Sequence, residues 1–217
     1  MKKILIARPN YDNGTNYLFF WSEEIITEAK SSGYNVTDVR GDEVTQKNII
    51  GRLNSVKPDF VFLNGHGSKD SYCGHNLEEV ITLSSAEALA NTVTFIRACN
   101  CLEELGEASI MKGGRAFIGY KKEFIIPFQY EYIARPLKDP MARPVLEASN
   151  QIPKSLINGS TASEAVDASH KFAKKQFLEI LFSSKYSEDL YLNGALMALV
   201  NNDLFLDMKG DKEAKIS

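Results

Sequence analysis

Along the first 120 residues, short runs rich in apolar and β-branched side chains alternate with segments whose apolar side chains recur at helical spacing. The runs predict strands, and those that are continuously apolar predict strands covered on both faces. The expected strands lie at residues 4–7, 35–39, 60–63, 92–98 and 116–120. The expected helices lie at residues 17–32, 43–55, 84–90 and 102–111.

Strands that alternate with helices indicate βαβ units, and right-handed crossovers then place helices on both faces of a mainly parallel sheet. We therefore expect an α/β fold of the three-layer α/β/α sandwich type. After Tyr120 the pattern changes, because four prolines make residues 121–144 loop-rich. Residues 145–206 predict a C-terminal helical segment, and the polar residues 207–217 predict a frayed tail. The chain is expected to be one domain, residues 1–217, with its core in about 1–125.

Composition narrows the class of protein. The 217 residues are 44% hydrophobic and 24% charged, which is typical of a soluble globular protein. The net charge of −3 argues against nucleic-acid binding, since a protein that neutralises phosphates should be basic. No apolar run approaches the roughly 20 residues of a membrane helix. Three cysteines cannot all pair within one chain, so a reducing cytoplasm is the expected compartment.

Two of the predicted strands end in residues that can carry chemistry. The run at 60–63 ends in Asn64-Gly65-His66-Gly67, and the run at 92–98 ends at Cys99. The carboxyl ends of neighbouring parallel strands meet at one edge of the sheet, where α/β proteins bind ligands. A cysteine beside an imidazole is a nucleophile, and glycines leave backbone N–H groups free to bind an oxyanion. The sequence therefore predicts a His66/Cys99 dyad.

These two blocks resemble those of the caspase-like cysteine peptidases (clan CD), which include caspases, metacaspases, gingipains and CHAT domains. Residues 60–67 match the histidine block, 92–99 the cysteine block and 116–120 the strand that follows. The resemblance implies a caspase-like fold and a cysteine endopeptidase that cleaves a polypeptide without a cofactor or metal. The Gln-Ala-Cys-x-Gly signature of caspases is absent, and only 33 residues separate His66 from Cys99. The sequence is therefore nearer to the gingipain-like and CHAT-like branches.

The resemblance also assigns residue roles. Cys99 becomes the nucleophile, His66 the general acid and base, and the N–H groups of Gly67 and Cys99 the oxyanion hole. The residue two before the nucleophile helps to form the pocket for the P1 side chain. Here it is Arg97, and Arg8 and Lys121 occupy two further pocket-forming places. Arginine there favours an acidic P1 residue, although an ion pair between Arg97 and a local carboxylate such as Glu103 or Glu104 is an equally good interpretation.

A metal site is the main alternative chemistry. Cys73, His75, Cys99 and Cys101 offer four soft ligands, but one intervening residue within each pair is poor spacing for structural zinc. We expect instead that the Cys73–His75 segment is a mobile loop over the cleft and that Cys101 starts the next helix. Cys101 could then trap Cys99 as a reversible disulfide.

Two other function classes stay open. One is a non-catalytic caspase-like module that binds a partner protein. The other is a flavodoxin-like nucleotide-binding domain, in which Asn13-Gly14-Thr15-Asn16 after the first strand holds a phosphate.

Overall fold

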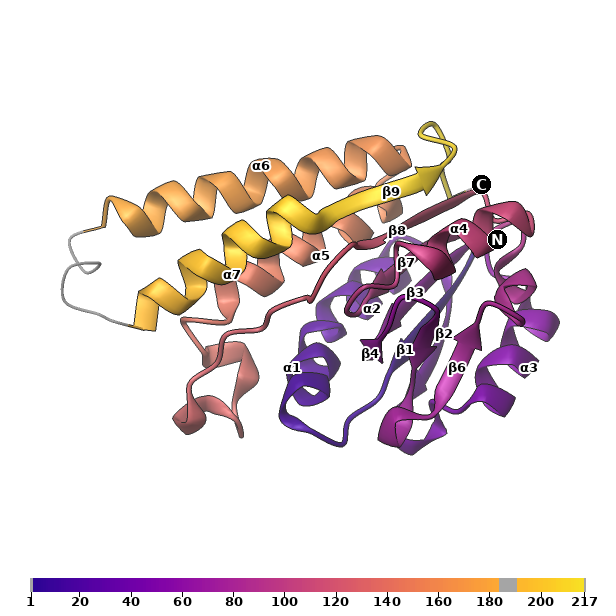
Figure 1. Ribbon diagram of the computed structural model, residues 1–217, viewed down its shortest axis with the longest axis horizontal. Helices are drawn as coiled ribbons and strands as arrows, with labels where there is room; N and C mark the ends of the chain where they lie inside the picture. The colour runs from indigo at the N-terminus through magenta and orange to yellow at the C-terminus, as the bar shows by residue number, and fades with distance from the viewer. Residues whose placement is uncertain (1, 184–190, 217) are drawn as a thin grey trace.

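A six-stranded sheet forms the middle layer of the protein (Figure 1). The computed structural model describes residues 2–183 and 191–216. The strand order of the sheet is β2-β1-β3-β7-β8-β9, and every neighbouring pair except β8 and β9 is parallel. The strands are β1 (Lys3–Arg8), β2 (Asn35–Arg40), β3 (Phe60–Asn64), β7 (Val93–Arg97), β8 (Ala116–Tyr120) and β9 (Leu206–Gly210). The five strands expected from the sequence are all present within two residues of their predicted bounds.

Strand β1 shows why these runs are continuously apolar. Ile4 and Ile6 belong to the core on one face of the sheet, whereas Leu5 and Ala7 belong to the core on the other face. All four residues have no exposed surface. Because successive strand side chains point to opposite faces, a strand between two helical layers needs apolar residues at every position. Each buried isoleucine or leucine contributes about 1.5–3 kcal/mol to stability.

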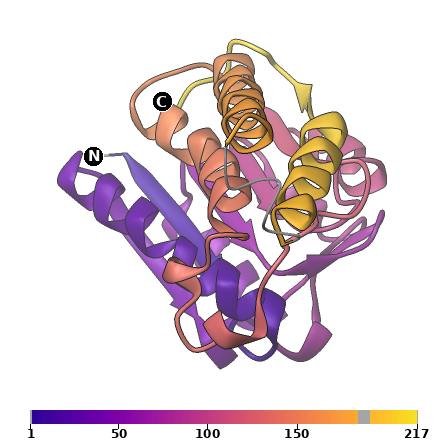
Figure 2. The same cartoon turned by 90° about the vertical axis from the view of Figure 1, so that its left-hand side faces the viewer.

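Helices cover both faces, which confirms the three-layer α/β/α architecture. On the face of Leu5 lie α3 (Gln46–Val56), α4 (Glu104–Met111) and the 3₁₀ turn η3 (Ala86–Leu89). On the face of Ile4 lie α1 (Asn13–Trp21), α2 (Glu23–Ser31), α5 (Arg143–Ile157) and α6 (Ala162–Leu181). Helix α7 (Tyr191–Phe205) packs against α5 and α6, and Figure 2 shows α6 and α7 side by side above the sheet. Residues 184–190 of the helical segment expected at 145–206 lie outside the described residues.

The expectation of a frayed tail was wrong. Residues Leu206–Gly210 form β9, which pairs antiparallel with β8 at the edge of the sheet. Beyond it, Ala214 and Ile216 are buried against the core on the α1 face. The segment looks polar because β9 is an edge strand that keeps only part of its surface buried, so it needs few apolar residues.

The first helical pattern, predicted as one helix over residues 17–32, divides into α1 and α2 at Ser22. Helix α1 begins four residues earlier than expected because Asp12 caps it. The Asp12 carboxylate accepts the backbone N–H of Thr15 at 2.7 Å, and the Thr15 hydroxyl accepts the N–H of Asp12. This capping box satisfies N–H groups that the first turn leaves without partners.

A small antiparallel sheet, absent from the sequence-based expectation, carries the histidine segment. It consists of β4 (His66–Gly67), β5 (Ser71–Cys73) and β6 (Glu79–Thr82), in that order. His66 pairs with Cys73, and Gly67 pairs with Tyr72. The sheet holds the segment in an extended conformation just beyond β3. The remaining short turns are η1 (Gly41–Glu43), η2 (His75–Leu77), η4 (Tyr130–Tyr132) and η5 (Pro136–Lys138).

Among the described helices, none combines the length and the apolar character that a membrane crossing requires.

Candidate functional site

The register between β3 and β7 places the histidine and the cysteine at one edge of the sheet. Asn64 lies opposite Arg97 in this parallel pair, so His66 and Cys99 each lie two residues beyond matched positions. Both line one cavity of about 160 Å³, together with Gly65 and Ala98. The carboxyl ends of β3 and β7 therefore bring the two sequence-predicted residues to a shared cavity.

Asp12, which is not among the site residues expected from the sequence, is hydrogen-bonded to the histidine. His66 Nε2 lies 2.7 Å from Asp12 Oδ2, and both side chains are more than a third exposed. Burial alone would raise the pKa of Asp12, but hydrogen bonds from the Thr15 N–H and from His66 hold it below its ordinary value. The signal in the sequence was the Asp-x-x-Thr capping pattern at residues 12–15, which fixes Asp12 just beyond the end of β1.

This contact assigns the two nitrogens of the imidazole. An ionised carboxylate only accepts hydrogen bonds, so Asp12 requires a proton on Nε2. In the neutral ring Nδ1 is then unprotonated and is the nitrogen that can take up a proton. Tyr11 flanks the ring, with its own ring centre 6.1 Å away. Asp12 thus sets both the tautomer and the orientation of His66.

Cys99 is a partly buried thiol. Burial raises its pKa above the ordinary value, and the backbone N–H of Phe124, 3.4 Å from Sγ, offsets part of that effect. The burial of the sulfur therefore favours the thiol over the thiolate. A thiol in this state becomes a nucleophile when a base removes its proton during attack.

Gly67 lies where only a glycine fits. A β-carbon at this position would lie 2.3 Å from Cys101 Sγ and 3.0 Å from the carbonyl oxygen of Cys99. Ser68 donates its N–H to Ser71 O at 2.9 Å, so the next pair along this antiparallel ladder, Gly67 with Tyr72, is not hydrogen-bonded. The Gly67 N–H consequently points away from β5, at the outer edge of the small sheet.

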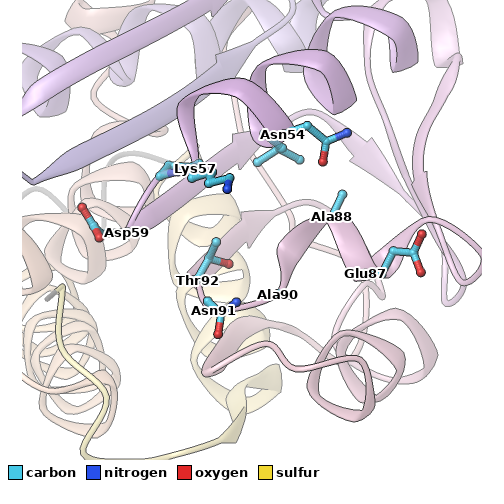
Figure 3. A pocket seen from close by; sticks show the side chains of 10 residues that line it. Asn54, Lys57, Asp59, Glu87, Ala88, Ala90, Asn91 and Thr92 are labelled. Atoms are coloured by element: carbon cyan, nitrogen blue, oxygen red, sulfur yellow. The ribbon is translucent and has the colours of Figure 1, made fainter.

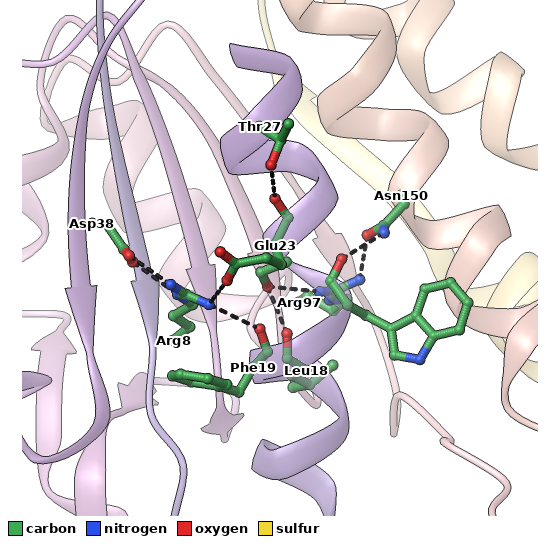
Figure 4. A network of polar contacts seen from close by, with 10 residues as sticks. Arg8, Leu18, Phe19, Glu23, Thr27, Asp38, Arg97 and Asn150 are labelled. Atoms are coloured by element: carbon green, nitrogen blue, oxygen red, sulfur yellow. Dashed lines mark hydrogen bonds and ion pairs between the residues drawn. The ribbon is translucent and has the colours of Figure 1, made fainter. Parts of the chain in front are cut away.

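Arg97 does not line the cavity, which corrects the expected contact with an acidic P1 side chain. The residue is fully buried and donates to Asn64 Oδ1 at 2.8 Å and Ser22 Oγ at 3.2 Å. It also donates to Asn150 Oδ1 at 2.7 Å (Figure 4). Desolvation lowers its pKa to about 10. The suggested ion pair with Glu103 or Glu104 is not formed either, because all three acceptors are neutral. The arginine joins β3, the junction of α1 and α2 at Ser22, and α5 in the core.

Arg8 and Lys121 also have partners away from the cavity. Arg8 is 2% exposed and forms ion pairs with Asp38, at 2.6 Å, and with Glu23 (Figure 4). Lys121 forms an ion pair with Asp207 of β9 at 2.6 Å. Neither residue lines the cavity of His66 and Cys99. The substrate-binding roles expected for these two residues therefore have no support in their positions.

The other cysteines and His75 are fixed in the fold. Cys73 pairs with His66 in the small sheet, so it belongs to a strand rather than to a loop over the cleft. His75 packs edge-on against Tyr11, with ring centres 5.2 Å apart. Cys101 is fully buried, 3.4 Å from Ser71 O, and precedes α4 by three residues. Within residues 2–183 and 191–216, no three His, Cys, Asp or Glu side chains gather as metal ligands.

The phosphate site suggested at residues 13–16 is occupied by the protein itself. These residues form the first turn of α1, and the Asp12 carboxylate already binds the Thr15 N–H there. The Thr15 hydroxyl donates to that same carboxylate at 2.8 Å. A negative charge at this helix end would repel a phosphate, which removes the observation that favoured the flavodoxin-like alternative.

A second hollow, of about 330 Å³, lies at the other end of the strands, opposite the His66 cavity (Figure 3). Lys57 and Asp59 precede β3, and Asn91 and Thr92 precede β7, so this hollow lies at the amino ends of the strands. Its lining residues include no cysteine or histidine. This hollow therefore holds neither residue of the predicted dyad.

Comparison with known proteins supports the fold. No protein-family model and no curated protein sequence matches the chain. A structure of the complex of RgpB pro- and mature domains from Porphyromonas gingivalis matches 99% of this chain with a TM-score of 0.58 and 15% identity. This chain spans about half of that one, 48%. A secreted C11 cysteine protease from Bacteroides thetaiotaomicron, "iotapain", aligns over 77% of this chain and 73% of its own at 8% identity, with a TM-score of 0.41. The likeness to the RgpB structure confirms the caspase-like α/β/α architecture and extends to the fold alone.

Proposed function

We propose that this protein is a cysteine peptidase in which Cys99 is the nucleophile, His66 the general acid and base, and Asp12 the group that orients His66. One observation carries the proposal. His66 of β4 and Cys99, which follows β7, line one cavity, and the histidine is held by a carboxylate so that Nδ1 is left to exchange a proton. A nucleophile, a base and an orienting group in this order are typical of covalent hydrolases.

In the proposed reaction, Cys99 Sγ attacks the carbonyl carbon of the scissile peptide bond while His66 takes up the thiol proton. The oxyanion is bound by the backbone N–H groups of Gly67 and Cys99. His66 then protonates the leaving amine, the carbon–nitrogen bond breaks, and a thioester remains. Water, deprotonated by His66, hydrolyses the thioester and restores the thiol.

The segment after β8 supports a peptide as the substrate. Asn202 of α7 accepts the N–H of Ile125 and donates to its carbonyl, each at 2.9 Å. Backbone groups alternate sides in an extended chain, so those of Phe124 and Ile126 face away from α7. On that side the backbone N–H of Phe124 donates to Cys99 Sγ. An extended peptide can add to such an edge through main-chain hydrogen bonds, with its carbonyl carbon near Cys99.

Labelling with a peptidyl acyloxymethyl ketone tests the proposal. We expect the wild-type protein to be alkylated at Cys99, as mapped by mass spectrometry, and a mixed peptide library to be cleaved. Cys99→Ser should lose both signals. Cys73→Ser is the matched control, since Cys73 is also a partly buried free cysteine next to His66, and it should keep both. Cleavage that persists in Cys99→Ser would contradict the proposal.

The partner-binding alternative has one observation in its favour. Helix α7 exposes Met197, Val200 and Leu204, which are 73%, 51% and 68% exposed. Apolar side chains gathered on one exposed helix face are typical of a protein-binding surface. This face does not include the His66 cavity, so the labelling experiment separates the two functions. A protein that binds partners but is not alkylated by the ketone at Cys99 would be the non-catalytic module.

A further inference from the structure

The cavity beside Cys99 is walled by apolar side chains. Leu18 comes from α1, Ala98 from the end of β7, and Phe124, Ile126 and Phe128 from the segment after β8. Apart from His66 and Cys99 themselves, no described residue that lines this cavity has a titratable side chain. Thr15 supplies a hydroxyl, but that hydroxyl already donates to Asp12.

From this wall we infer that the cavity is the P1 pocket of the proposed peptidase and that it selects a large apolar side chain, such as leucine, methionine or phenylalanine. This inference rests on the proposed function and names its substrate class. It replaces the acidic P1 residue that the position of Arg97 suggested from the sequence.

The size of the cavity fits one such side chain. Its volume is about 160 Å³. An apolar cavity of about 150 Å³ lined by leucine, isoleucine and phenylalanine takes up benzene in another protein. The space therefore accepts a phenyl ring or a branched aliphatic group. Cys99, which lines the cavity, then lies next to the carbonyl carbon of the same residue.

The two arginines that could bind an acidic P1 side chain are already bonded to other residues of the protein. Arg97 is buried among three neutral acceptors, and Arg8 is paired with Asp38 and Glu23. An aspartate side chain in the cavity would find neither arginine, and an arginine side chain would find the Asp12 carboxylate already bonded to His66 and the Thr15 N–H. Either would lose its hydration without a free ionic partner, which is strongly unfavourable. The pocket therefore discriminates against charge as well as favouring apolar surface.

The wall is held in place before a substrate binds. The ring of Phe124 packs against that of Tyr120 with centres 4.6 Å apart, and the ring of Phe128 packs against that of Tyr17 at 5.5 Å. Asn202 binds both backbone groups of Ile125 between them. A preformed apolar pocket orders few groups when the substrate binds, so its selectivity appears directly in kcat/KM.

A series of fluorogenic tetrapeptides that differ only at P1 tests the inference on the wild-type protein. We expect kcat/KM for leucine, methionine or phenylalanine to exceed that for aspartate and arginine by about 100-fold or more. Higher or equal values for aspartate or arginine would overturn the apolar pocket while leaving the peptidase intact. Failure to cleave any peptide, together with no ketone labelling of Cys99, would overturn the proposed function itself.

Two neighbouring substitutions locate the selectivity. Ile126→Lys places an ammonium group at the wall of the pocket, and the ratio of aspartate to leucine cleavage should rise about 10-fold or more. Ile125→Lys is the matched control, because Ile125 is 40% exposed and does not line the cavity. It should keep the wild-type order of P1 residues. An equal change of the ratio in both variants would overturn the placement of the pocket.

Discussion

Asp12 Oδ2 lies 2.7 Å from His66 Nε2, although 54 residues separate the two in the sequence. The same carboxylate caps α1 by accepting the N–H of Thr15. One residue therefore joins the start of a helix to the base of the candidate site. The two roles can be separated, because asparagine caps a helix about as well as aspartate but carries no charge.

Asp12→Asn should lower kcat/KM by about 100-fold or more, since the histidine loses the acceptor that sets its tautomer. Its free energy of unfolding should stay within about 0.5 kcal/mol of the wild type, because the cap is kept. Asp12→Ala should lose the activity and also about 1 kcal/mol of stability. Denaturant unfolding and peptide cleavage measure the two effects. Full activity in Asp12→Asn would contradict the orienting role.

The burial of Cys99 predicts how its alkylation depends on pH. Burial disfavours the thiolate and raises the pKa, so the rate of reaction with iodoacetamide should reach half its maximum at a higher pH than for a free cysteine. The rate is measured on the protein without substrate, and the labelled site is mapped by mass spectrometry. A half-maximum below the pH found for a model thiol would show instead that His66 and Cys99 rest as an ion pair.

Arg97 is predicted to stabilise the folded protein and not to contact the substrate. Arg97→Ala leaves Asn64 Oδ1 and Asn150 Oδ1 without their donor and opens a cavity, at a cost of about 3–5 kcal/mol of unfolding free energy. Arg97→Met removes the guanidinium, whose carbon lies 5.1 Å from the centre of the Phe62 ring, but its apolar side chain fills most of the space, so its loss should be at least about 1 kcal/mol smaller. Urea unfolding measures both. The expected order of P1 residues is unchanged in the methionine variant, and a switch of that order would return Arg97 to the substrate pocket.

Gly67 is predicted to be fixed by packing against Cys101. Gly67→Ala should destabilise the protein by about 1–3 kcal/mol, because the new β-carbon meets Cys101 Sγ and the Cys99 carbonyl oxygen. Removing the sulfur in the Gly67→Ala/Cys101→Ala double variant should recover part of the loss, since the closest contact then disappears. A double-mutant cycle in unfolding free energy measures the coupling. Additive losses would show that the two positions do not compete for space.

The local pattern of apolar and polar residues predicted the order of the main strands and helices. It also predicted the positions of the His66 and Cys99 segments. A strand covered on both faces must be apolar throughout, and a histidine or cysteine directly after such a strand must lie at the sheet edge. The core strands were predicted correctly because full burial leaves a continuous apolar run. The tail at 207–217 was mispredicted because its strand is only partly buried. An edge strand such as β9 is half exposed and leaves only a weak pattern.

The sequence by itself determined the α/β/α layers and the candidate pair His66 and Cys99, because burial and strand ends are local properties of the chain. The tertiary structure decided which groups meet them. Arg97 had the right position for a substrate contact, but Asn64, Ser22 and Asn150, which lie 33, 75 and 53 residues away, bind it in the core. Asp12 and the apolar wall at Phe124–Phe128 reached the site through the folding of distant segments. Partners so far apart in sequence are selected by packing and by hydrogen-bond satisfaction, which no local pattern records.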